Sequence, residues 1–114
     1  MTDQHQQVGG GRALLGDFAP KLAALTDDVL FADVWNRPQL SARDRSLITV
    51  AVLAAGGNTE QLSFHLGHAI GNGVTREELI EAITHVTFYA GWPHGMAAMG
   101  VAQQFFTNQT SGAA

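Results

Sequence analysis

Cysteine is absent from the 114-residue sequence. Without cysteine there can be no disulfide bond, no thiolate nucleophile, and no zinc or iron–sulfur centre held by thiolates. The absence also fits a protein of the reducing cytoplasm, and that is the location we expect.

Charge is the second scarce property. Charged residues make up 14% of the chain, and the net charge is −4 with only six lysines and arginines. An average soluble domain carries about 25% charged residues. No run of basic residues exists, so we expect no nucleic-acid partner. The longest strongly apolar stretch, residues 47–55, is too short to span a bilayer, and the polar, glycine-rich first dozen residues do not resemble a signal peptide.

Low charge combined with 46% hydrophobic residues is unusual for a small domain, which has much surface for its volume. We interpret it as surface buried against further copies of the chain, and we therefore predict an obligate oligomer.

Sustained alternation of apolar and polar residues, the mark of strands, is missing as well. The sequence predicts an all-α protein, a compact bundle of about six helices over residues 12–106. A flexible arm is expected at 1–11 and a flexible tail at 107–114.

Capping residues, glycines and prolines mark the expected helix ends. Ser41–Asp44, Asn58–Gln61 and Thr75–Glu78 have the form of capping boxes. The helix over 43–55 is apolar nearly all round, so it is either central in the bundle or sandwiched between subunits. The expected helices cover residues 18–25, 26–35, 43–55, 58–72, 75–91 and 93–106.

Five polar residues on the fourth of these helices follow one another at spacings of 3, 4, 3 and 4, which places them along one line. They are Asn58, Gln61, His65, His68 and Asn72. Such a line beside a buried face suits a pocket wall. The alternatives are that Asn58 and Gln61 only cap the helix and that His68 is simply solvated. His65 lies nearest the apolar face and is the strongest candidate.

His65 and His68 could also bracket a metal ion, with Glu60 or His94 as a further ligand. The usual His-Glu-x-x-His arrangement is missing and no second carboxylate is obviously placed. We expect no metal.

Arg43 and Arg45 stand in the first turn of the most apolar helix, where a buried guanidinium needs an anionic partner. That partner is either a carboxylate of the protein, such as Asp44 or Glu60, or the carboxylate of a substrate held by a bidentate clamp. Trp92-Pro93-His94 forms a turn in which we expect Trp92 to plug the core, with His94 as an alternative pocket residue near a helix N-terminus.

Several of these elements, in this order, resemble the carboxymuconolactone decarboxylase family, whose fold is that of alkylhydroperoxidase D. The resemblance runs from about Phe18 to Val101. It is carried by Trp35-Asn-Arg37-Pro38, Arg45-Ser46-Leu47, Glu60-x4-His65-Leu66, Asn72-Gly73-x-Thr75-x-Glu77-Glu78 and Tyr89-Ala90-Gly91-x-Pro93.

The peroxidase-type branch of this fold uses a Cys-x-x-Cys pair, a following histidine and an upstream glutamate. Here Asn58 and Gln61 stand at the cysteine positions and Ser46 at the glutamate position, and only His65 remains. Thiol redox chemistry is therefore excluded.

The resemblance implies homotrimers or homohexamers with active sites at subunit contacts. It also implies loss of CO2 from γ-carboxymuconolactone, giving the enol-lactone of 3-oxoadipate in protocatechuate catabolism, without a cofactor. Our hypothesis takes His65 as the proton donor and Arg45, helped by Arg43, as the carboxylate anchor. The residues that could complete the pocket are Ser46, Glu60, His68, Trp92 and His94. The alternatives are another small lactone or carboxylic acid as substrate, or a non-catalytic oligomeric binding protein.

Overall fold

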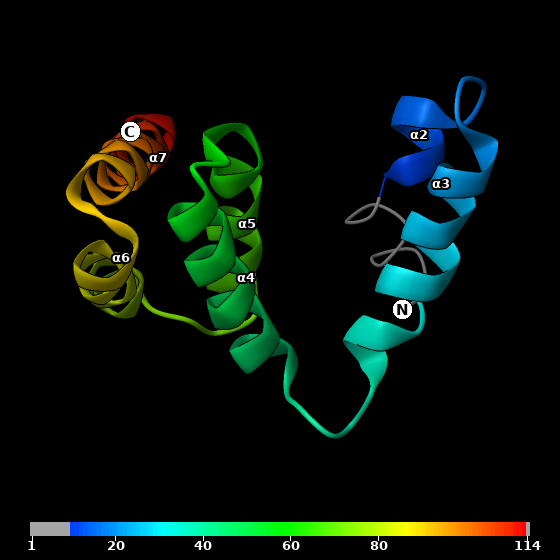
Figure 1. Ribbon diagram of the computed structural model, residues 1–114, viewed down its shortest axis with the longest axis horizontal. Helices are drawn as coiled ribbons and strands as arrows, with labels where there is room; N and C mark the ends of the chain where they lie inside the picture. The colour runs from blue at the N-terminus through cyan, green and yellow to red at the C-terminus, as the bar shows by residue number, and fades with distance from the viewer. Residues whose placement is uncertain (1–9, 114) are drawn as a thin grey trace. The chain divides into compact units, whose positions relative to one another are not determined.

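The computed structural model describes residues 10–113, with the backbone alone for residues 110–113. Over this range the chain forms six α-helices, labelled α2 to α7 in Figure 1, one π-helix, one 3-10 helix and no strand. The prediction of an all-α protein is confirmed. No helix in this part of the chain combines the length and apolarity needed to cross a membrane. Most of the predicted flexible arm, residues 1–9, lies outside the described residues and stays a prediction.

The chain divides into two compact units, Met1–Ala42 and Arg43–Ala114. The elements of the first are α2 (Gly11–Leu15), α3 (Pro20–Ala24), the π-helix η1 (Leu25–Phe31) and the 3-10 helix η2 (Val34–Asn36).

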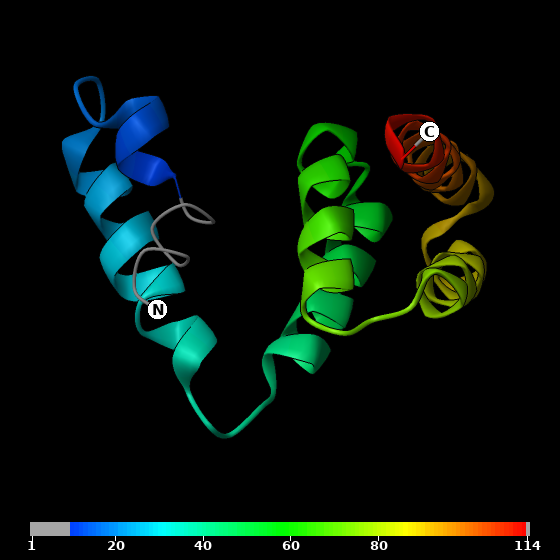
Figure 2. The ribbon, with the colours of Figure 1, turned by 180° about the vertical axis from the view of Figure 1, so that it is seen from behind.

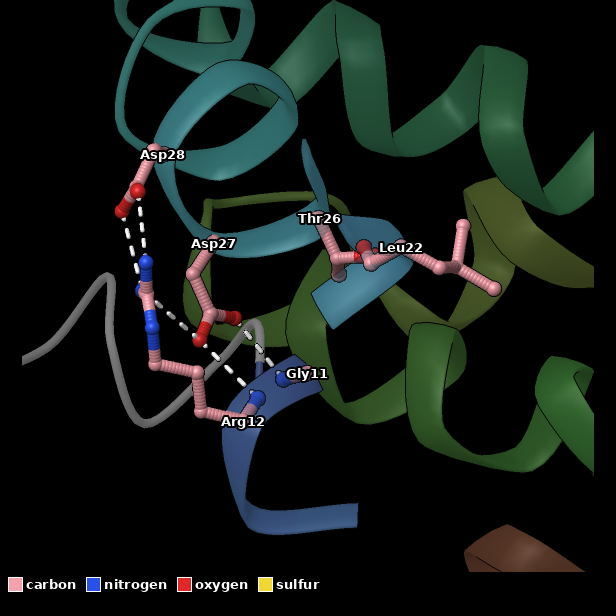
Figure 3. A network of polar contacts seen from close by, with 6 residues as sticks. All are labelled: Gly11, Arg12, Leu22, Thr26, Asp27 and Asp28. Atoms are coloured by element: carbon pink, nitrogen blue, oxygen red, sulfur yellow. Dashed lines mark hydrogen bonds and ion pairs between the residues drawn. The ribbon is translucent and has the colours of Figure 1, made fainter. Parts of the chain in front are cut away.

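A buried carboxylate holds the helices of the first unit together (Figure 3). Asp27 accepts hydrogen bonds from the backbone N–H groups of Gly11, at 2.7 Å, and Arg12, at 3.0 Å. The N-cap residue of α2, Gly10, makes no side-chain cap bond. Asp27 therefore satisfies the open N-terminus of a helix that lies 16 positions earlier in the chain.

The predicted helix break at Thr26 is wrong. The Thr26 hydroxyl donates to the carbonyl of Leu22 at 2.8 Å, and η1 follows α3 without a gap. The acid that was expected to start a new helix instead caps α2. Gly11, assigned above to the arm, is the first residue of α2, and a Cβ on it would meet the carbonyl oxygen of Ala23 at 2.8 Å.

The second unit consists of two helical hairpins, which Figures 1 and 2 show as α4 beside α5 and α6 beside α7. Gly57 and Asn58 connect the first pair, and Gly91 connects the second. The helices are α4 (Ala42–Gly56), α5 (Thr59–Gly71), α6 (Arg76–Ala90) and α7 (Trp92–Ala113).

One hydrophobic core joins these four helices. Its members are almost fully buried, and removal of their apolar surface from water is the main driving force for folding. They are Val50, Ala54, Leu62, Leu66, Ala69, Val74, Leu79, Ile83, Ala98 and Ala102.

Most of the helix ends in this unit match the sequence signals. The capping box at α6 is confirmed, because the Thr75 hydroxyl accepts from Glu78 N–H at 3.1 Å and the Glu78 carboxylate accepts from Thr75 N–H at 2.9 Å. Asn58 does precede α5, but its side chain makes no cap bond there. The last helix does not end near Phe106 and continues to Ala113.

α4 is not the central helix of this unit. Its buried residues are Ser46, Val50 and Ala54, whereas Ile48 and Val52 are 52% and 62% exposed. Burial of this helix between subunits, the other explanation of its apolar character, stays a prediction.

Gly95 provides a test of the contact between α6 and α7. A Cβ on Gly95 would lie 1.9 Å from the Thr87 hydroxyl oxygen, whereas one on Gly100, in the same helix, would meet nothing within 4 Å. We expect Gly95→Ala to lower the free energy of unfolding by about 2–3 kcal/mol through overpacking. Gly100→Ala should raise it by about 0.5–1 kcal/mol through helix propensity. Urea denaturation measures both, and equal effects would contradict the close contact.

Candidate active site

The orientation of α5 places its polar line at the edge of the core. Leu62, Leu66 and Ala69 are fully buried. The polar residues lie beside them with graded exposure: Asn58 and Gln61 are exposed, whereas His65, His68 and Asn72 are half-buried. The histidines therefore stand at a boundary between apolar core and solvent.

A partly buried hydrogen bond joins this line to α4. The Asn72 side-chain N–H donates to the Ser46 hydroxyl oxygen at 2.9 Å, and Ser46 is 0% exposed. The first turn of α4 therefore lies against the last turn of α5, and the two helices run antiparallel. Ser46 is bonded inside the protein and is not presented to a ligand.

Arg45 precedes Ser46 and so lies level with Asn72. On α4, Thr49 follows one turn later on the same face, and its hydroxyl donates to the carbonyl of Arg45 at 2.8 Å. Ala51, Val52 and Ala55 of α4 line a groove with residues of α6, and Val52 follows Arg45 by seven residues, on nearly the same face of the helix. We call the edge that carries Arg45, Thr49, His65 and His68 the α4–α5 seam.

Helix geometry sets the spacing along this seam. His68 lies four residues before Asn72 and His65 seven residues before it. A rise of 1.5 Å per residue places the Arg45 level and the His65 level about 10 Å apart along the helices.

The surroundings of His65 favour the neutral imidazole. Burial, and secondarily the neighbouring charge of His68, lowers the pKa of His65 from 6.5 to about 4. The two imidazole rings are 5.9 Å apart, and the Phe64 ring stands edge-on to His65 at 5.0 Å. The Nδ1 atoms of both histidines are buried, so a ligand would approach through Nε2. At neutral pH His65 is therefore a neutral imidazole.

Glu60 lies on a different flank of α5. It is exposed and lines a groove of about 610 Å³ with α7 residues such as Ala97 and Gln104. Five residues correspond to about 140° around a helix, so Glu60 and His65 point to different sides. The structure does not bring them together in one subunit.

Arg43 is engaged away from the seam. Its guanidinium bonds the carboxylate of Glu78 at the start of α6 and that of Asp44 at 3.3 Å. It forms a partly exposed ion pair that links α4 to α6.

Trp92 and His94 lie at the far end of α4 from Arg45. A Cβ on Gly57 would be 3.3 Å from the His94 Nε2 atom, so His94 packs against the α4–α5 turn, about 18 Å of helix from Arg45. Trp92 is 57% exposed and meets Phe88 edge-on at 5.1 Å. The expectation that Trp92 plugs the core is wrong.

Three grooves mark the surface of the second unit. They lie between α6 and α7 (about 690 Å³), between α5 and α7, and between α4 and α6 (about 480 Å³). Arg45 and His65 line none of these three. Among the described residues, no group of three or more histidines and carboxylates is placed to hold a metal ion.

Sequence reasoning missed two residues of the seam region, Thr49 and Phe64, and one bond, that of Asn72. Asn72 was counted in the polar line, but its bond to Ser46 bridges 26 positions and has no local signal. Thr49 stands one turn after Arg45, a spacing that could have identified it. Phe64 adjoins His65 in sequence, and its edge-on contact follows only from the observed ring geometry.

The lowered pKa of His65 predicts a pH dependence of stability. Between pH 6.5 and pH 4 the unfolded chain binds a proton at this histidine that the folded chain does not. The free energy of unfolding should therefore fall as the pH drops through this range, by about 1–2 kcal/mol for a partly buried ring. His65→Gln should flatten this slope, and His85→Gln, on an exposed face of α6, serves as the control for loss of an imidazole. An unchanged slope in His65→Gln, from denaturation series at several pH values, would contradict the burial of the ring.

Comparison with known proteins indicates the same family as the sequence motifs. Residues 20–104 match the model of the carboxymuconolactone decarboxylase family. A 4-carboxymuconolactone decarboxylase of Acinetobacter baylyi is 41% identical over 92 residues, which cover 81% of this chain and 69% of that protein. A nitrosuccinic acid decarboxylase of Metarhizium robertsii is 39% identical over 71 residues, 62% of this chain and 50% of that protein. The chain belongs to the carboxymuconolactone decarboxylase family.

Proposed function

We propose that this chain is a carboxy-lyase that removes CO2 from 4-carboxymuconolactone, giving the enol-lactone of 3-oxoadipate in the breakdown of protocatechuate. The activity named for the bacterial relative supports the choice of substrate. The observation that carries the proposal is His65, a half-buried imidazole whose pKa burial lowers to about 4, on the helix that the Asn72–Ser46 bond joins to the first turn of α4.

The substrate itself supplies the electron sink. Its departing carboxylate is attached to the saturated carbon next to a double bond that is conjugated with the lactone carbonyl, so the electron pair of the breaking C–C bond flows onto the carbonyl oxygen. No pyridoxal, thiamine or metal is required for this step. The protein has to hold the second carboxylate, stabilise the oxyanion and return a proton to carbon.

Arg45 anchors the retained carboxylate. A guanidinium offers two parallel N–H donors to a carboxylate, which fixes its orientation as well as its position. Arg45 is half-buried in the first turn of α4, so this contact forms in a partly desolvated place where charge interactions are stronger than in water.

His65 transfers the proton. In the empty seam the ring is neutral, because burial lowers its pKa to about 4. A bound carboxylate places negative charge beside it and raises the pKa, so the ring takes up a proton as substrate binds. After CO2 leaves, the imidazolium donates that proton to the carbon and becomes neutral again. The net reaction consumes one proton and releases one CO2.

His65 and His68 have different roles in this proposal. His68 lies one turn from His65 on the side of Arg45, and its charge opposes protonation of His65. We assign it to binding the anionic substrate. Glu60, Trp92 and His94 lie on another flank or at the other end of the hairpin, so they join such a site only if a second subunit supplies them.

Self-association is part of the proposal, as a homotrimer or homohexamer. Six large apolar side chains of the second unit are 52% exposed or more in the single chain, and an average interface buries such residues at its centre. They are Ile48, Val52, Phe88, Tyr89, Trp92 and Met96.

Another small dicarboxylic acid is the second candidate substrate. The fungal relative is named for nitrosuccinic acid, which also carries two carboxylates and a group that can accept the electron pair left by CO2. With this substrate, Arg45 would bind the retained carboxylate and His65 would supply the proton. A non-catalytic binding protein is the alternative if neither acid is turned over.

Release of CO2 from the lactone and from nitrosuccinate by the purified protein tests the proposal. We expect His65→Gln to lower kcat about 10²- to 10⁴-fold, the usual contribution of a general acid. Arg45→Gln should act mainly on KM, because it removes the anchor. His85→Gln, exposed on α6, is the matched histidine control and should behave as the parent chain.

Unchanged turnover in a folded His65→Gln protein would remove this histidine from the mechanism. Activity toward nitrosuccinate alone would favour the second candidate.

A further inference from the structure

The bond between Ser46 and Asn72 joins two segments that are 26 positions apart. Ser46 lies in the first turn of α4 and is completely buried, and Asn72 is the residue that ends α5. The Asn72 side chain donates and the Ser46 hydroxyl oxygen accepts, at 2.9 Å. A polar contact of this kind sits at the edge of a core that is otherwise apolar.

Backbone hydrogen bonds also hold Asn72 in place. Its N–H donates to the carbonyls of His68, at 3.0 Å, and Ala69, at 3.1 Å. Gly73 follows with φ +100°, a conformation that suits glycine, and turns the chain toward α6. The side-chain amide is therefore aimed at α4 from a fixed point on α5.

Apolar packing alone sets the register of two helices loosely. Aliphatic side chains such as Val50 and Leu66 tolerate small shifts, and a core of suitable volume can be packed in more than one way. A hydrogen bond is directional and short-ranged, so a slide of one helix by an ångström or two breaks it. Breaking it would leave the buried Ser46 hydroxyl without this partner, which opposes the slide.

This register decides the distance across the seam. Arg45 is the residue before Ser46, and His68 and His65 stand four and seven residues before Asn72 on one face of α5. Any slide or roll of α4 against α5 therefore changes the separation between the arginine and the histidines directly.

We propose that Asn72 and Ser46 are positioning residues that lock α4 and α5 in the register at which Arg45 and His65 act on one substrate. The proposal rests on the proposed function for its catalytic consequence. Neither residue touches the substrate, because Ser46 is wholly buried and Asn72 is occupied with it. Ser46 was expected among the catalytic residues, and this role replaces that one.

Comparison of the two single variants with the double variant distinguishes a positioning role from an effect on stability alone. Asn72→Ala leaves the buried Ser46 hydroxyl without this partner and should lower Tm by about 5 °C, whereas Ser46→Ala leaves a half-buried amide that water can reach and should lower Tm less. Ser46→Ala with Asn72→Ala removes both groups, and its Tm should return toward that of the parent. Its kcat should nevertheless stay about 10- to 100-fold lower, because misplacement by about an ångström costs that much.

The control variant is Gln104→Ala. Gln104 donates to Asn108 at 2.9 Å on the exposed face of α7, so its loss removes a comparable side-chain bond away from the seam. It should leave kcat unchanged. A double Ser46/Asn72 variant with the kcat of the parent would overturn the proposal.

A distance measurement tests the register without any activity. The chain has no cysteine, so spin labels can be placed at single introduced cysteines, at Ile48 on α4 and Gln61 on α5, which are both exposed. With labelled protein diluted in unlabelled chain, the parent should give one narrow interspin distance, and the double Ser46/Asn72 variant a broader or shifted one.

Identical distributions would overturn the proposal. If the parent chain releases CO2 from neither acid, the proposed function fails, and the distance measurement alone decides whether this bond sets the register.

Discussion

Burial of one face of α5 is the constraint on which the rest of the site depends. Leu62, Leu66 and Ala69 must all face the core, and with them buried only one rotation of the helix is possible. That rotation places Gly67 toward α7, where a Cβ would be 3.5 Å from the Phe105 ring, and the polar line toward α4. His65 stands next to the buried face, so the packing that stabilises the unit also desolvates the imidazole.

Desolvation gives this imidazole a chemistry suited to an anionic substrate. A histidine in water would be partly charged near neutral pH, and its proton would be available to any solute. In the proposed mechanism the ring stays neutral until a negative charge arrives beside it, so protonation is coupled to the binding of an acid. In the same proposal Arg45 binds the second carboxylate, and the pair favours small dicarboxylates as a class.

The sequence predicted a feature correctly where the residues that form it are close together in the chain. The capping box of Thr75 and Glu78 lies within four residues and was predicted correctly, as was the end of α6 at Gly91. Thr26 and Asp27 stood at another expected helix start, but Asp27 bonds the start of α2 across 16 positions, and no nearby residue reveals that. Trp92 was expected to plug the core from a turn, but it is the first residue of α7 and its ring is exposed.

The candidate site was likewise predicted only in part from the sequence. Periodicity and the family motif both indicated His65, and helix geometry alone would have separated it from Glu60, since five residues turn a helix to a different side. The pairing of α4 with α5 could not be read from spacing, because it depends on the contact of Ser46 with Asn72. The arrangement of the residues along each helix is therefore a sequence property, whereas the distance between the two helices is a property of the fold.

The charge state of His65 is the central claim, and nuclear magnetic resonance titration of its imidazole Cε1–H signal measures it directly. The signal can be assigned by its disappearance in His65→Gln. The ligand-free protein should titrate with a midpoint near pH 4, and an unreactive dicarboxylate such as succinate should move the midpoint upward. A midpoint near 6.5 that succinate leaves unchanged would contradict a desolvated imidazole that gains its proton with the substrate.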